Sequence, residues 1–402
     1  MSAQSLKPRW KMVKFGEVVK DANLVERDPE ANNIERVVGL EHIDPENLHI
    51  RRWNSVSDGS SFTRKFVQGQ TLFGKRRAYQ RKVAYAEFEG ICSGDILTFE
   101  PKNTKVLLPE LLPFICQSDA FFDHALGTSA GSLSPRTSWK ALKEFEFPLP
   151  PLDEQKRIAE ILWAADEAVE AYESVTQNIE RAINAYSDKK LLLHEARKKK
   201  PNIPSGWRIG FLHEIAQIDP PMPKGLPDDL EISFVPMESV DEEGSISKLE
   251  IKKLGEVRKG YTYFEENDVL FAKITPCMEN GKGAIAVSLK NNKGMGSTEY
   301  YVFRAIKSED TQFIYHLTMS GVFRKRAEKW MQGSAGHRRV PKDFFARRAI
   351  VIPDSESRRK ISFVLNSLQS QKFEARRHID VIRKILAVFL QKSLSQTGAA
   401  HV

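Results

Sequence analysis

The stretch PLDEQKRIAEILWAADEAVEAYESVTQNIERAINAY, residues 151–186, carries the most regular pattern in the chain. Apolar residues recur in it at seven-residue intervals, and neither Pro nor Gly interrupts it after Pro151. The pattern predicts a long α-helix, from Leu152 to about residue 195 with a rise of about 65 Å, that packs along one side against another helix. The predicted seam, the line of residues that faces the other helix, consists of Ile158, Ala165, Tyr172, Ile179 and Tyr186. We expect a second line of the same seam at Ile161, Ala168, Val175 and Ala182.

The same pattern returns after Pro353. The seam predicted there consists of Ile361, Leu368, Ala375, Ile382 and Phe389, interleaved by Leu365, Ile379 and Leu386. Two such helices in one chain most simply pack against each other as an antiparallel coiled coil. The alternative, that each helix pairs with a helix of another chain, is left open by the sequence.

The two helices belong to a larger internal repeat. At offsets that range from 173 to 205 residues, five segments recur in order. They are Trp10–Glu17 with Trp207–Glu214, Val38–Asp44 with Val235–Asp241, Gly94–Leu97 with Asn267–Leu270, Ser129–Gly131 with Ser334–Gly336, and Pro150–Leu162 with Pro353–Leu365. Short β-like runs punctuated by Gly, Pro and Asn precede each helix, so we predict an α+β fold of two tandem repeats. The expected boundaries are 1–150 and 201–352 for the two globular domains, and 151–200 and 353–396 for the two helices.

Composition narrows the class of protein. The 402 residues are 41% hydrophobic and 28% charged, which predicts two or three globular domains. The sequence has no run of about 18 uncharged apolar residues and no apolar leader, so we expect no membrane segment and a cytoplasmic location. Its three cysteines, Cys92, Cys116 and Cys277, lack a CxxC spacing, which argues against a disulfide framework and a zinc site. The net charge of +8 is compatible with a nucleic-acid partner.

Two basic stretches are candidates for contact with DNA, because Arg and Lys reach phosphates and guanine edges while Asn suits adenine. The first provides Lys75, Arg76, Arg77, Tyr79, Arg81 and Lys82, and the second Lys273, Thr275, Asn280 and Lys282. Two loops with glycines, hydroxyls and cations belong with these stretches. They provide Ser129, Ser132 and Arg136 in the first repeat, and Ser334, His337, Arg338 and Arg339 in the second.

A search for catalytic motifs finds near misses only. Gly69–Lys75 matches a phosphate-binding loop, but Arg76 replaces the Ser or Thr that would bind magnesium. Asp219–Met222 has Met where the base-flipping loop of amino-methyltransferases has an aromatic residue, and Asp228 with Glu250 and Lys252 fits only a loose nuclease pattern. We therefore predict no catalytic residue and no metal site in this chain.

The junction at residues 148–159, PLPPLDEQKRIA, resembles the junction motif of the specificity (S) subunits of type I restriction-modification enzymes. The stretches GKRRAYQRKVA at 74–84 and DVLFAKITPCMENGKG at 268–283 are similar to segments of their target-recognition domains. The second junction, PDSESRRKI at 353–361, departs from the pattern because it lacks the double proline and the Glu-Gln pair. The resemblance covers nearly the whole chain.

This resemblance implies that each globular domain reads one half of a bipartite target in double-stranded DNA and that the helices set the gap. It also implies that two methyltransferase (M) subunits using S-adenosylmethionine and ATP- and Mg-dependent restriction (R) subunits join a chain that is itself non-catalytic and holds no cofactor. Two alternatives stay open: a stand-alone DNA methyltransferase or nuclease with a built-in recognition region, and a coiled-coil scaffold with solubilising basic patches.

Overall fold

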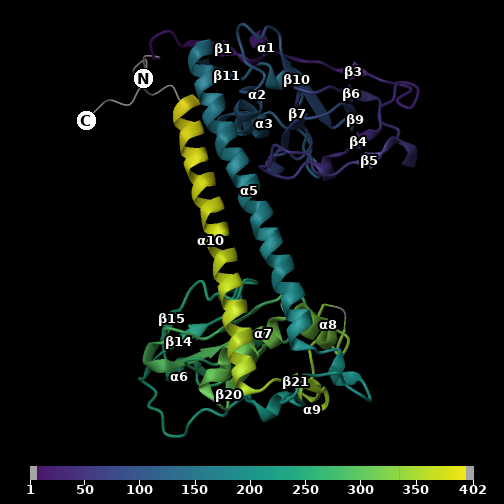
Figure 1. Cartoon of the computed structure of the whole chain (residues 1–402). Helices are drawn as coiled ribbons and strands as arrows, with labels where there is room; N and C mark the ends of the chain where they lie inside the picture. Colours follow the sequence, from purple (N-terminus) through teal and green to yellow (C-terminus); the bar gives the residue numbers. More distant parts are fainter. Residues whose placement is uncertain (1–6, 335, 395–402) are drawn as a thin grey trace. The chain divides into compact units, whose positions relative to one another are not determined.

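The computed structural model describes residues 7–334 and 336–394, which form two compact units (Figure 1). Unit 1 is drawn from Met1–Tyr172 and Arg377–Val402, and unit 2 is Glu173–Arg376. Both long helices, α5 (Leu152–Leu191) and α10 (Ser355–Leu394), cross from one unit to the other. We call the described residues before α5 globule 1 and those between α5 and α10 globule 2. Each unit therefore contains one globule and a segment of both helices.

Globule 1 contains three sheets. A four-stranded antiparallel sheet has the order β2 (Val19–Asp21), β10 (Ile96–Pro101), β7 (Thr71–Gly74) and β8 (Val83–Tyr85). A five-stranded sheet has the order β3 (Leu24–Val25), β6 (Arg64–Phe66), β9 (Gly90–Cys92), β4 (Arg36–Val38) and β5 (Asn54–Ser55). Strand β1 (Lys11–Lys14) pairs with β11 (Glu146–Leu149), which leads directly into α5.

Helices cover the four-stranded sheet of globule 1 through an aromatic core. The α-helices are α1 (Phe15–Val18), α2 (Leu112–Gln117), α3 (Asp119–Gly127) and α4 (Trp139–Leu142), with 3-10 turns η1 (Leu40–His42), η2 (Val56–Asp58) and η3 (Ala78–Gln80). Phe73 and Phe99 of the sheet stack on each other, and Phe121 of α3 meets Phe73 edge to face. The same core includes Ile158 and Leu162, so the first turns of α5 are packed against globule 1.

Globule 2 has the same plan. Its first sheet has the order β13 (Ala216–Ile218), β20 (Tyr300–Ala305), β17 (Val269–Ala272) and β18 (Gly283–Ile285). Its second has the order β15 (Glu250–Lys253), β14 (Glu231–Val235), β19 (Lys293–Gly296) and β16 (Thr262–Glu265), and β12 (Arg208–Gly210) pairs with β21 (Ile350–Ile352). The helices are α6 (Leu254–Val257), α7 (Thr311–Met319), α8 (Gly321–Glu328) and α9 (Asp343–Arg347), with 3-10 turns η4 (Glu195–Arg197), η5 (Leu212–Glu214), η6 (Met237–Ser239), η7 (Lys290–Asn292) and η8 (Ser308–Asp310).

Strand pairing confirms the tandem repeat. The sheet β2-β10-β7-β8 of globule 1 and the sheet β13-β20-β17-β18 of globule 2 have equivalent strands in the same order. The five-stranded sheet of globule 1 and the sheet β15-β14-β19-β16 of globule 2 each contain one parallel pair, β4-β9 and β14-β19. One matched segment was wrong, however. Gly94–Leu97 leads into β10, which is equivalent to β20, whereas Asn267–Leu270 leads into β17, which is equivalent to β7.

The true counterpart of Asn267 is Gly69. The two residues have φ of 69° and 89°, and their amides donate to the carbonyls of Ala286 and Ala86 at 2.7 and 2.8 Å. The incorrect match arose because a left-handed or flexible residue followed by Asp and two apolar residues is a common way to enter a strand. Four letters were therefore too few to separate one strand of the sheet from another.

In each unit the segments of α5 and α10 pack together and run antiparallel. In unit 1, Tyr172 stacks on His378 with ring centroids 5.0 Å apart, and Leu162, earlier in α5, lines the same cavity as Leu390, later in α10. In unit 2, Leu191 shares a core with Ile361, whereas Glu180, earlier in α5, pairs with Lys372, later in α10. As one helix is followed forward, its contacts move backward along the other.

The structure places the seam residues Ile158, Ile361, Leu365, Ala375 and Ile379 in buried positions. The other residues of the first α5 line and of the α10 seam are half-buried: Ala165, Tyr172, Ile179, Tyr186, Leu368, Ile382, Leu386 and Phe389. The second seam line expected on α5 is wrong. Ile161 and Val175 are 41% and 46% exposed, whereas Leu162 is 1% exposed and Val169 and Thr176 are buried.

Both the third and the fourth residue after a seam position lie near the same face of a helix with 3.6 residues per turn. The sequence has apolar residues at both offsets, and packing selects the fourth. Helix α5 also ends at Leu191 rather than near residue 195, because Leu192 adopts a left-handed φ of 46° and Leu193 turns into the core of unit 2. Its 40 residues rise about 60 Å.

Candidate nucleic-acid interface

In unit 1 the basic stretch that follows β7 lies against the glycine- and serine-containing loop that precedes α4. The amide of Arg77 donates to the carbonyl of Pro135 at 2.7 Å, and the amide of Thr137 donates to the carbonyl of Lys75 at 3.0 Å. Arg77 and Arg81, with φ of 54° and 52°, flank the 3-10 turn η3 and reverse the chain there. The two predicted segments of the first repeat therefore form one surface.

Unit 2 repeats this arrangement after β17. The amide of Thr275 donates to the carbonyl of Arg338 at 2.9 Å, and the amide of Val340 donates to the carbonyl of Lys273 at 2.9 Å. We call the two surfaces loop surface 1 and loop surface 2. Loop surface 1 consists of residues 75–82 and 128–137, and loop surface 2 of residues 273–282 and of 332–334 with 336–340.

Two arginines of loop surface 1 are held by one carboxylate. Arg136 contacts Asp95 through Nε at 2.9 Å, and Arg76 lies 3.6 Å from the same carboxylate. Burial acts to raise the pKa of Asp95, but the hydrogen bond from Arg136 and the charges of Lys75 and Arg76 lower it, and the net shift is downward. The carboxylate thus stays ionised and fixes the direction of both guanidinium groups.

Loop surface 2 holds its arginines in the same manner with different acids. Arg339 contacts Glu299 at 2.8 Å, and Arg338 contacts Glu279 at 3.3 Å. Thr275 also donates to Glu279, at 2.7 Å. Lys273 lies over the ring of Tyr301, 5.0 Å from its centroid.

Three of the predicted cations bind backbone carbonyls of their own globule. Arg81 donates to the carbonyl of Gln117 at 2.8 Å and lies over the ring of Phe122. Lys82 and Lys282 hold equivalent carbonyls of the 3-10 turns, Leu40 at 2.5 Å and Met237 at 3.3 Å. These contacts give the three residues a structural task within each globule.

The remaining predicted residues lie at the surface. Within the described part of the chain, the side chains of Lys75 and Arg77 make no hydrogen bond or ion pair, and Tyr79 is 56% exposed. Ser129 donates to the carbonyl of Ala125 at 2.8 Å. The side chains of Ser132, Asn280, Ser334 and His337 are exposed.

The structure does not support a catalytic role for the near-miss motifs described next. Thr71–Gly74 is the buried strand β7, so no loop is present there to surround a phosphate. Asp228 is held by Arg258 at 2.7 Å, and Glu250 is 3.5 Å from Lys252. Over residues 7–334 and 336–394 we find no group of three or more His, Cys, Asp or Glu side chains placed to hold a metal ion. None of the helices described has the length and apolarity that crossing a membrane requires.

The residues that join each globule to its helix were not singled out from the sequence. Gln155, fully buried in α5, donates to the carbonyls of Val106 and Pro150 and accepts from the amide of Leu108, at 2.8 to 2.9 Å. In α10 the equivalent residue is Arg358, which contacts Asp310 at 2.6 Å and the carbonyl of Pro353. The second junction therefore differs from the first because an ion pair replaces the hydrogen bonds of a neutral side chain. The offset of 203 residues between the two helices aligns Gln155 with Arg358 and could have indicated this exchange.

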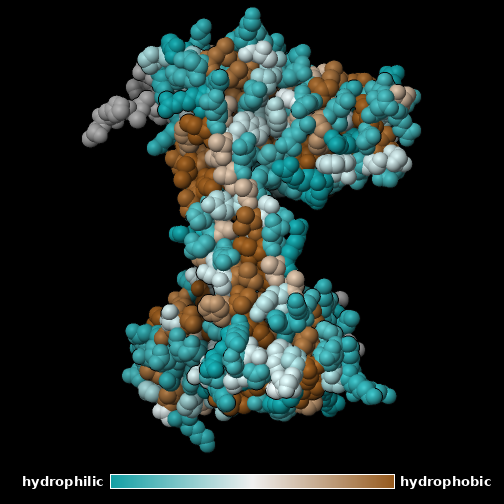
Figure 2. All heavy atoms as spheres, in the orientation of Figure 1, coloured by the Kyte–Doolittle hydropathy of each residue, from teal (hydrophilic) through white to brown (hydrophobic). Residues whose placement is uncertain are grey.

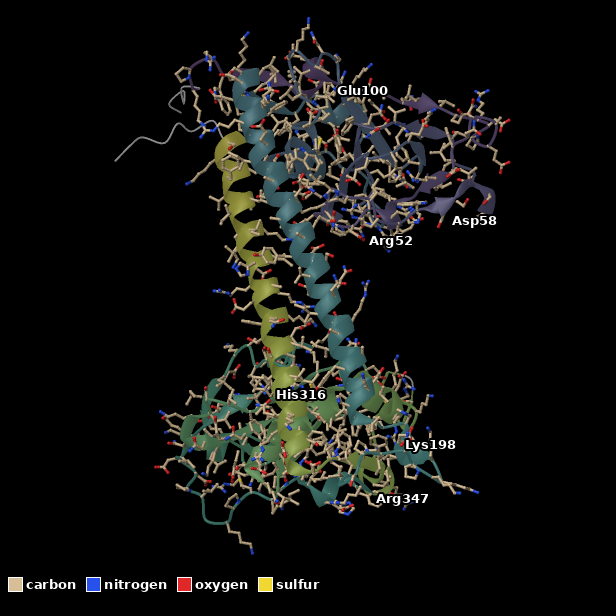
Figure 3. All side chains as sticks on the ribbon, viewed as in Figure 1. Arg52, Asp58, Glu100, Lys198, His316 and Arg347 are labelled. Carbon is tan, nitrogen blue, oxygen red and sulfur yellow. The ribbon has the colours of Figure 1, made fainter. Side chains whose placement is uncertain are left out.

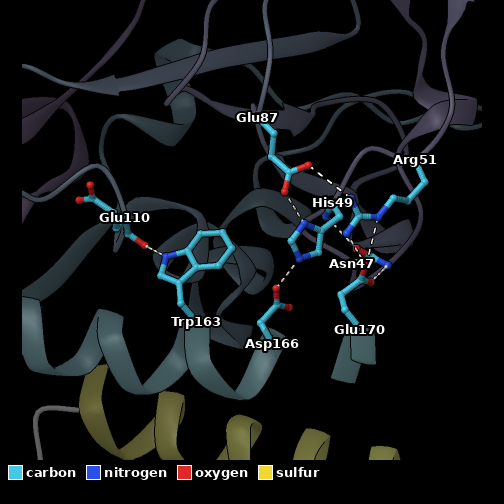
Figure 4. A network of polar contacts seen from close by, with 8 residues as sticks. All are labelled: Asn47, His49, Arg51, Glu87, Glu110, Trp163, Asp166 and Glu170. Atoms are coloured by element: carbon cyan, nitrogen blue, oxygen red, sulfur yellow. Dashed lines mark hydrogen bonds and ion pairs between the residues drawn. The ribbon is translucent and has the colours of Figure 1, made fainter. Parts of the chain in front are cut away.

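A second joint in unit 1 combines residues that are far apart in the sequence (Figure 4). His49 lies between Glu87 and Asp166, with its ring nitrogens 2.7 and 2.8 Å from their oxygens. The hydrogen bond with Asp166 raises the pKa of His49 to about 9, burial opposes the rise, and the hydrogen bond with Glu87 adds to it. No sequence motif connects these three residues, so sequence reasoning had no signal for them.

The chain consists of two tandem repeats of one α+β domain. Each domain has a basic loop surface and is followed by a long helix, which is typical of a binding protein with two separate binding surfaces. A family model described as the type I restriction modification DNA specificity domain matches the chain twice, at residues 9–181 and 204–381. Because the two matches cover most of the chain, it belongs to the family of type I restriction-modification DNA specificity proteins, as the junction motif predicts.

Two relatives from Escherichia coli match part of the chain. The specificity subunit of the type I restriction enzyme EcoEI is 39% identical over 210 residues, which is 49% of this chain and 35% of the relative. That of EcoAI is 38% identical over 178 residues, which is 44% of this chain and 30% of the relative. The chain thus matches about a third of the length of these relatives, 35% and 30%.

Solved structures support the fold over nearly the whole chain. The S subunit of a type I restriction-modification system from M. genitalium matches with a TM-score of 0.57 and 13% identity, covering 97% of both chains. A chain from a structure on the assembly and conformational transition of a type I R-M system matches with a TM-score of 0.52 and 20% identity, covering 96% of this chain and 98% of that one. At these identities the likeness concerns the fold alone.

Proposed function

We propose that this chain is the non-catalytic subunit that selects the DNA sequence for a type I restriction-modification complex. Each globule would read one half of a bipartite target in double-stranded DNA. The observation that carries the proposal is the presence of two equivalent loop surfaces, one after β7 and one after β17, each with cations held in defined directions. Two readers on one chain suit a target that has two separate halves.

Within loop surface 1, contacts divide the cations into two kinds. Arg76 and Arg136 are held on Asp95, which suits contacts with phosphates of fixed position. Lys75 and Arg77 are half-buried and their side chains make no hydrogen bond or ion pair in the described structure, and Tyr79 provides an exposed ring beside them. We infer that Arg77 reads base edges, since a bidentate arginine to guanine is the commonest specific contact in the major groove.

On loop surface 2 the candidates for base contact are Lys273, Asn280 and His337. Asn280 and His337 are exposed, and an asparagine amide can pair with adenine in two hydrogen bonds. Arg338 and Arg339, held by Glu279 and Glu299, are the counterparts of the held pair on the first surface. The two surfaces differ in side chains, which fits two different half-sites.

The long helices would set the gap between the half-sites. A helix of 40 residues rises about 60 Å, close to two turns of B-DNA at about 34–36 Å per turn. The spacer role predicts that the gap is a fixed number of base pairs.

The helices would also bind two M subunits. In unit 1, the C-terminal part of α10 exposes Val381, Ile385 and Val388, and Figure 2 shows hydrophobic side chains gathered along it. These positions are spaced by four and three residues, so they form one stripe on the helix. We propose that the methyltransferase subunits, which use S-adenosylmethionine, dock on the helices and that R subunits using ATP and Mg join them in the cytoplasm, while this chain holds no cofactor.

The test is single-molecule sequencing of methylated bases in the source strain with and without this gene. We expect a split motif with a fixed gap to disappear when the gene is deleted and to return with a plasmid copy. A plasmid copy of the chain truncated before α10 is the matched control and should not restore the motif. An unchanged methylation pattern in a strain that expresses the complex, or methylation or cleavage of DNA by the purified chain alone, would contradict the proposal.

A further inference from the structure

Four ion pairs that join globule 1 to α5 have a common polarity. In each of them the base lies in the globule and the acid lies in α5. The pairs are Arg9–Asp153, Arg9–Glu154, His49–Asp166 and Arg51–Glu170.

Four ion pairs that join globule 2 to α10 have the opposite polarity. Here the base lies in α10 and the acid lies in the globule. The pairs are Arg358–Asp310, Arg359–Glu309, Lys372–Glu243 and Arg376–Glu243.

The reversal is present in the helix sequences themselves. Residues 152–172, the part of α5 in unit 1, contain six acidic and two basic residues. Residues 355–376, the part of α10 in unit 2, contain two acidic and five basic residues. These two segments are equivalent by the repeat, so equivalent helix faces carry opposite charge.

In unit 1 the loop 47–51 is fastened to α5 at two points one turn apart (Figure 4). The side chain of His49 is 10% exposed and contacts Asp166, while Arg51 and Asn47 both contact Glu170, through Nε at 3.1 Å and Nδ2 at 3.3 Å. The amide of His49 donates to the side chain of Asn47 at 2.7 Å, which makes the loop rigid between its contacts. Two contacts on successive turns restrict rotation of the loop about the helix, which a single contact would allow.

In unit 2 the loop 241–245 is fastened to α10 by one acid and two bases. Glu243 contacts Lys372 at 3.1 Å and also contacts Arg376, and the Lys372 side chain is only 14% exposed. The loop packs closely on α7, because a Cβ added at Gly244, where φ is 90°, would lie 1.8 Å from the Tyr315 hydroxyl. The backbone therefore delivers Glu243 to a defined place on the helix.

We propose that these ion pairs are positioning residues that hold each globule at a set angle on its helix, with reversed polarity making each set specific for its own globule. If globule 1 were packed on a helix with the charges of α10, its basic residues would face basic residues of the helix. If globule 2 were packed on a helix with the charges of α5, its acidic residues would face acidic residues of the helix. The part of this inference that concerns the DNA gap rests on the proposed function, because the angle of each globule contributes to the distance between the half-sites. The part that concerns the joint itself does not depend on DNA.

The first test measures the joint in unit 1 by pulsed dipolar electron spin resonance on the full chain. Spin labels are placed at Ser61→Cys in globule 1 and Glu167→Cys in α5, both exposed positions, in a Cys277→Ser background. The variants are Arg51→Glu, Glu170→Arg and the two together, with Glu170→Gln as the neutral change. We expect each reversal to broaden the distance distribution, the neutral change to broaden it less, and the double reversal to narrow it again.

Glu243→Lys, in unit 2, is the matched control and should leave the unit 1 distance unchanged. Circular dichroism checks that each variant is folded. If a charge reversal fails to fold, the neutral variant Glu170→Gln provides the comparison with the parent. An unchanged distribution in the single reversals, or in Glu170→Gln where these do not fold, would overturn the proposal. A double reversal as broad as either single one would overturn it too.

The second test measures methylation by the assembled complex on targets whose gap is native or longer or shorter by one base pair. We expect Glu170→Arg to lower the preference for the native gap by about twofold to fivefold, with both half-site sequences unchanged and the double reversal restoring it. A merely structural role would reduce methylation of all three targets equally and would overturn the positioning role. If the unaltered complex methylated no split target, the proposed function would fail while the spin-label result would still decide the joint.

Discussion

The two joints between globule and helix solve one packing problem with different chemistry. In unit 1 the buried junction residue is neutral Gln155, and Phe114 of α2 meets Trp163 of α5 edge to face at 5.1 Å. In unit 2 the equivalent residues are Arg358, paired with Asp310, and His316, which lies against α10 and contacts Asn366 at 2.7 Å (Figure 3). Polar pairs thus replace neutral and aromatic contacts at matched places.

The comparison shows that a repeat conserves the places of contact more strictly than their chemistry. Buried polar groups need partners, so a change on the helix must be accompanied by a change on the globule. Gln155 satisfies backbone groups, whereas Arg358 requires the carboxylate of Asp310. The two joints should therefore respond differently to the same kind of substitution.

The largest effect is expected for Arg358→Ala, because it leaves the buried carboxylate of Asp310 without its partner. We expect a loss of about 3–5 kcal/mol in the free energy of unfolding, measured by urea denaturation. Arg359→Ala, its exposed neighbour with a 3.8 Å pair to Glu309, is the control and should cost less than about 1 kcal/mol. Equal losses in the two variants would contradict the special place of Arg358.

A double variant that gives the unit 2 joint the chemistry of the unit 1 joint tests the comparison directly. Arg358→Gln combined with Asp310→Leu gives unit 2 the residues that unit 1 has at the equivalent places, Gln155 and Leu108. We expect this double variant to recover stability to within about 1 kcal/mol of the parent, since a buried ion pair replaced as a whole costs little. Urea denaturation of the double variant and of Arg358→Gln alone measures the difference, and a double variant no more stable than the single one would show that the two joints are not interchangeable in chemistry.

Two of the buried histidines, His49 and His316, should give the units opposite pH dependence. His49 has a folded pKa of about 9, above its ordinary value of about 6.5, so its contribution to stability is complete below about pH 6.5 and is lost as the pH rises through 9. Burial lowers the pKa of His316 to about 4, so its site loses stability as the pH falls from about 6.5 toward 4. Each effect amounts to at most about 1.4 kcal/mol per pH unit.

The measurement compares thermal denaturation of the parent with His49→Gln and His316→Gln across the pH range. The parent's advantage over His49→Gln should shrink above neutral pH, and its advantage over His316→Gln should shrink below it. The charged and aromatic groups that surround His49 are Glu87, Asp166, Arg51 and Trp163. Parallel pH profiles for the two variants would refute the assignment of opposite charge states.

The smallest effect is expected at the exposed end of the unit 1 joint. Arg9→Ala removes a 2.9 Å pair with Asp153 in which both side chains are largely exposed. Solvent screens such a pair, so we expect a change below about 1 kcal/mol in the free energy of unfolding, measured by urea denaturation. A loss as large as that of Arg358→Ala would mean that the N-terminal segment has a greater part in the joint than its exposure indicates.

The sequence predicted the features that depend on periodicity and repetition. The two long helices, the tandem α+β globules and the family follow from the heptads, the ordered repeats and the PLPPLDEQKRIA junction. It could not decide which of two apolar lines on α5 faces inward, because Ile161 and Leu162 are equally suitable until the globule and α10 pack on the helix. His49 and Asp166 were missed because a contact between residues 117 positions apart leaves no local pattern.

For the loop surfaces, the sequence identified cations but not their tasks. Arg81 has the same side chain as Arg77, yet its guanidinium is used on Gln117 and Phe122 inside the globule. The difference depends on backbone turns around η3 that no residue count reveals. Charge in a sequence therefore indicates a surface, and the fold selects the residues available for a partner.

The most direct test of the central claim, that each unit reads one half of the target, compares Arg77→Ala with Lys273→Ala in the assembled complex. The measurement is the methylated motif of each variant, read by single-molecule sequencing of genomic DNA. The account predicts that Arg77→Ala relaxes the sequence of one half-site and Lys273→Ala that of the other, each by about 1–3 kcal/mol of discrimination, with the gap unchanged. Relaxation of both half-sites by either variant would contradict it.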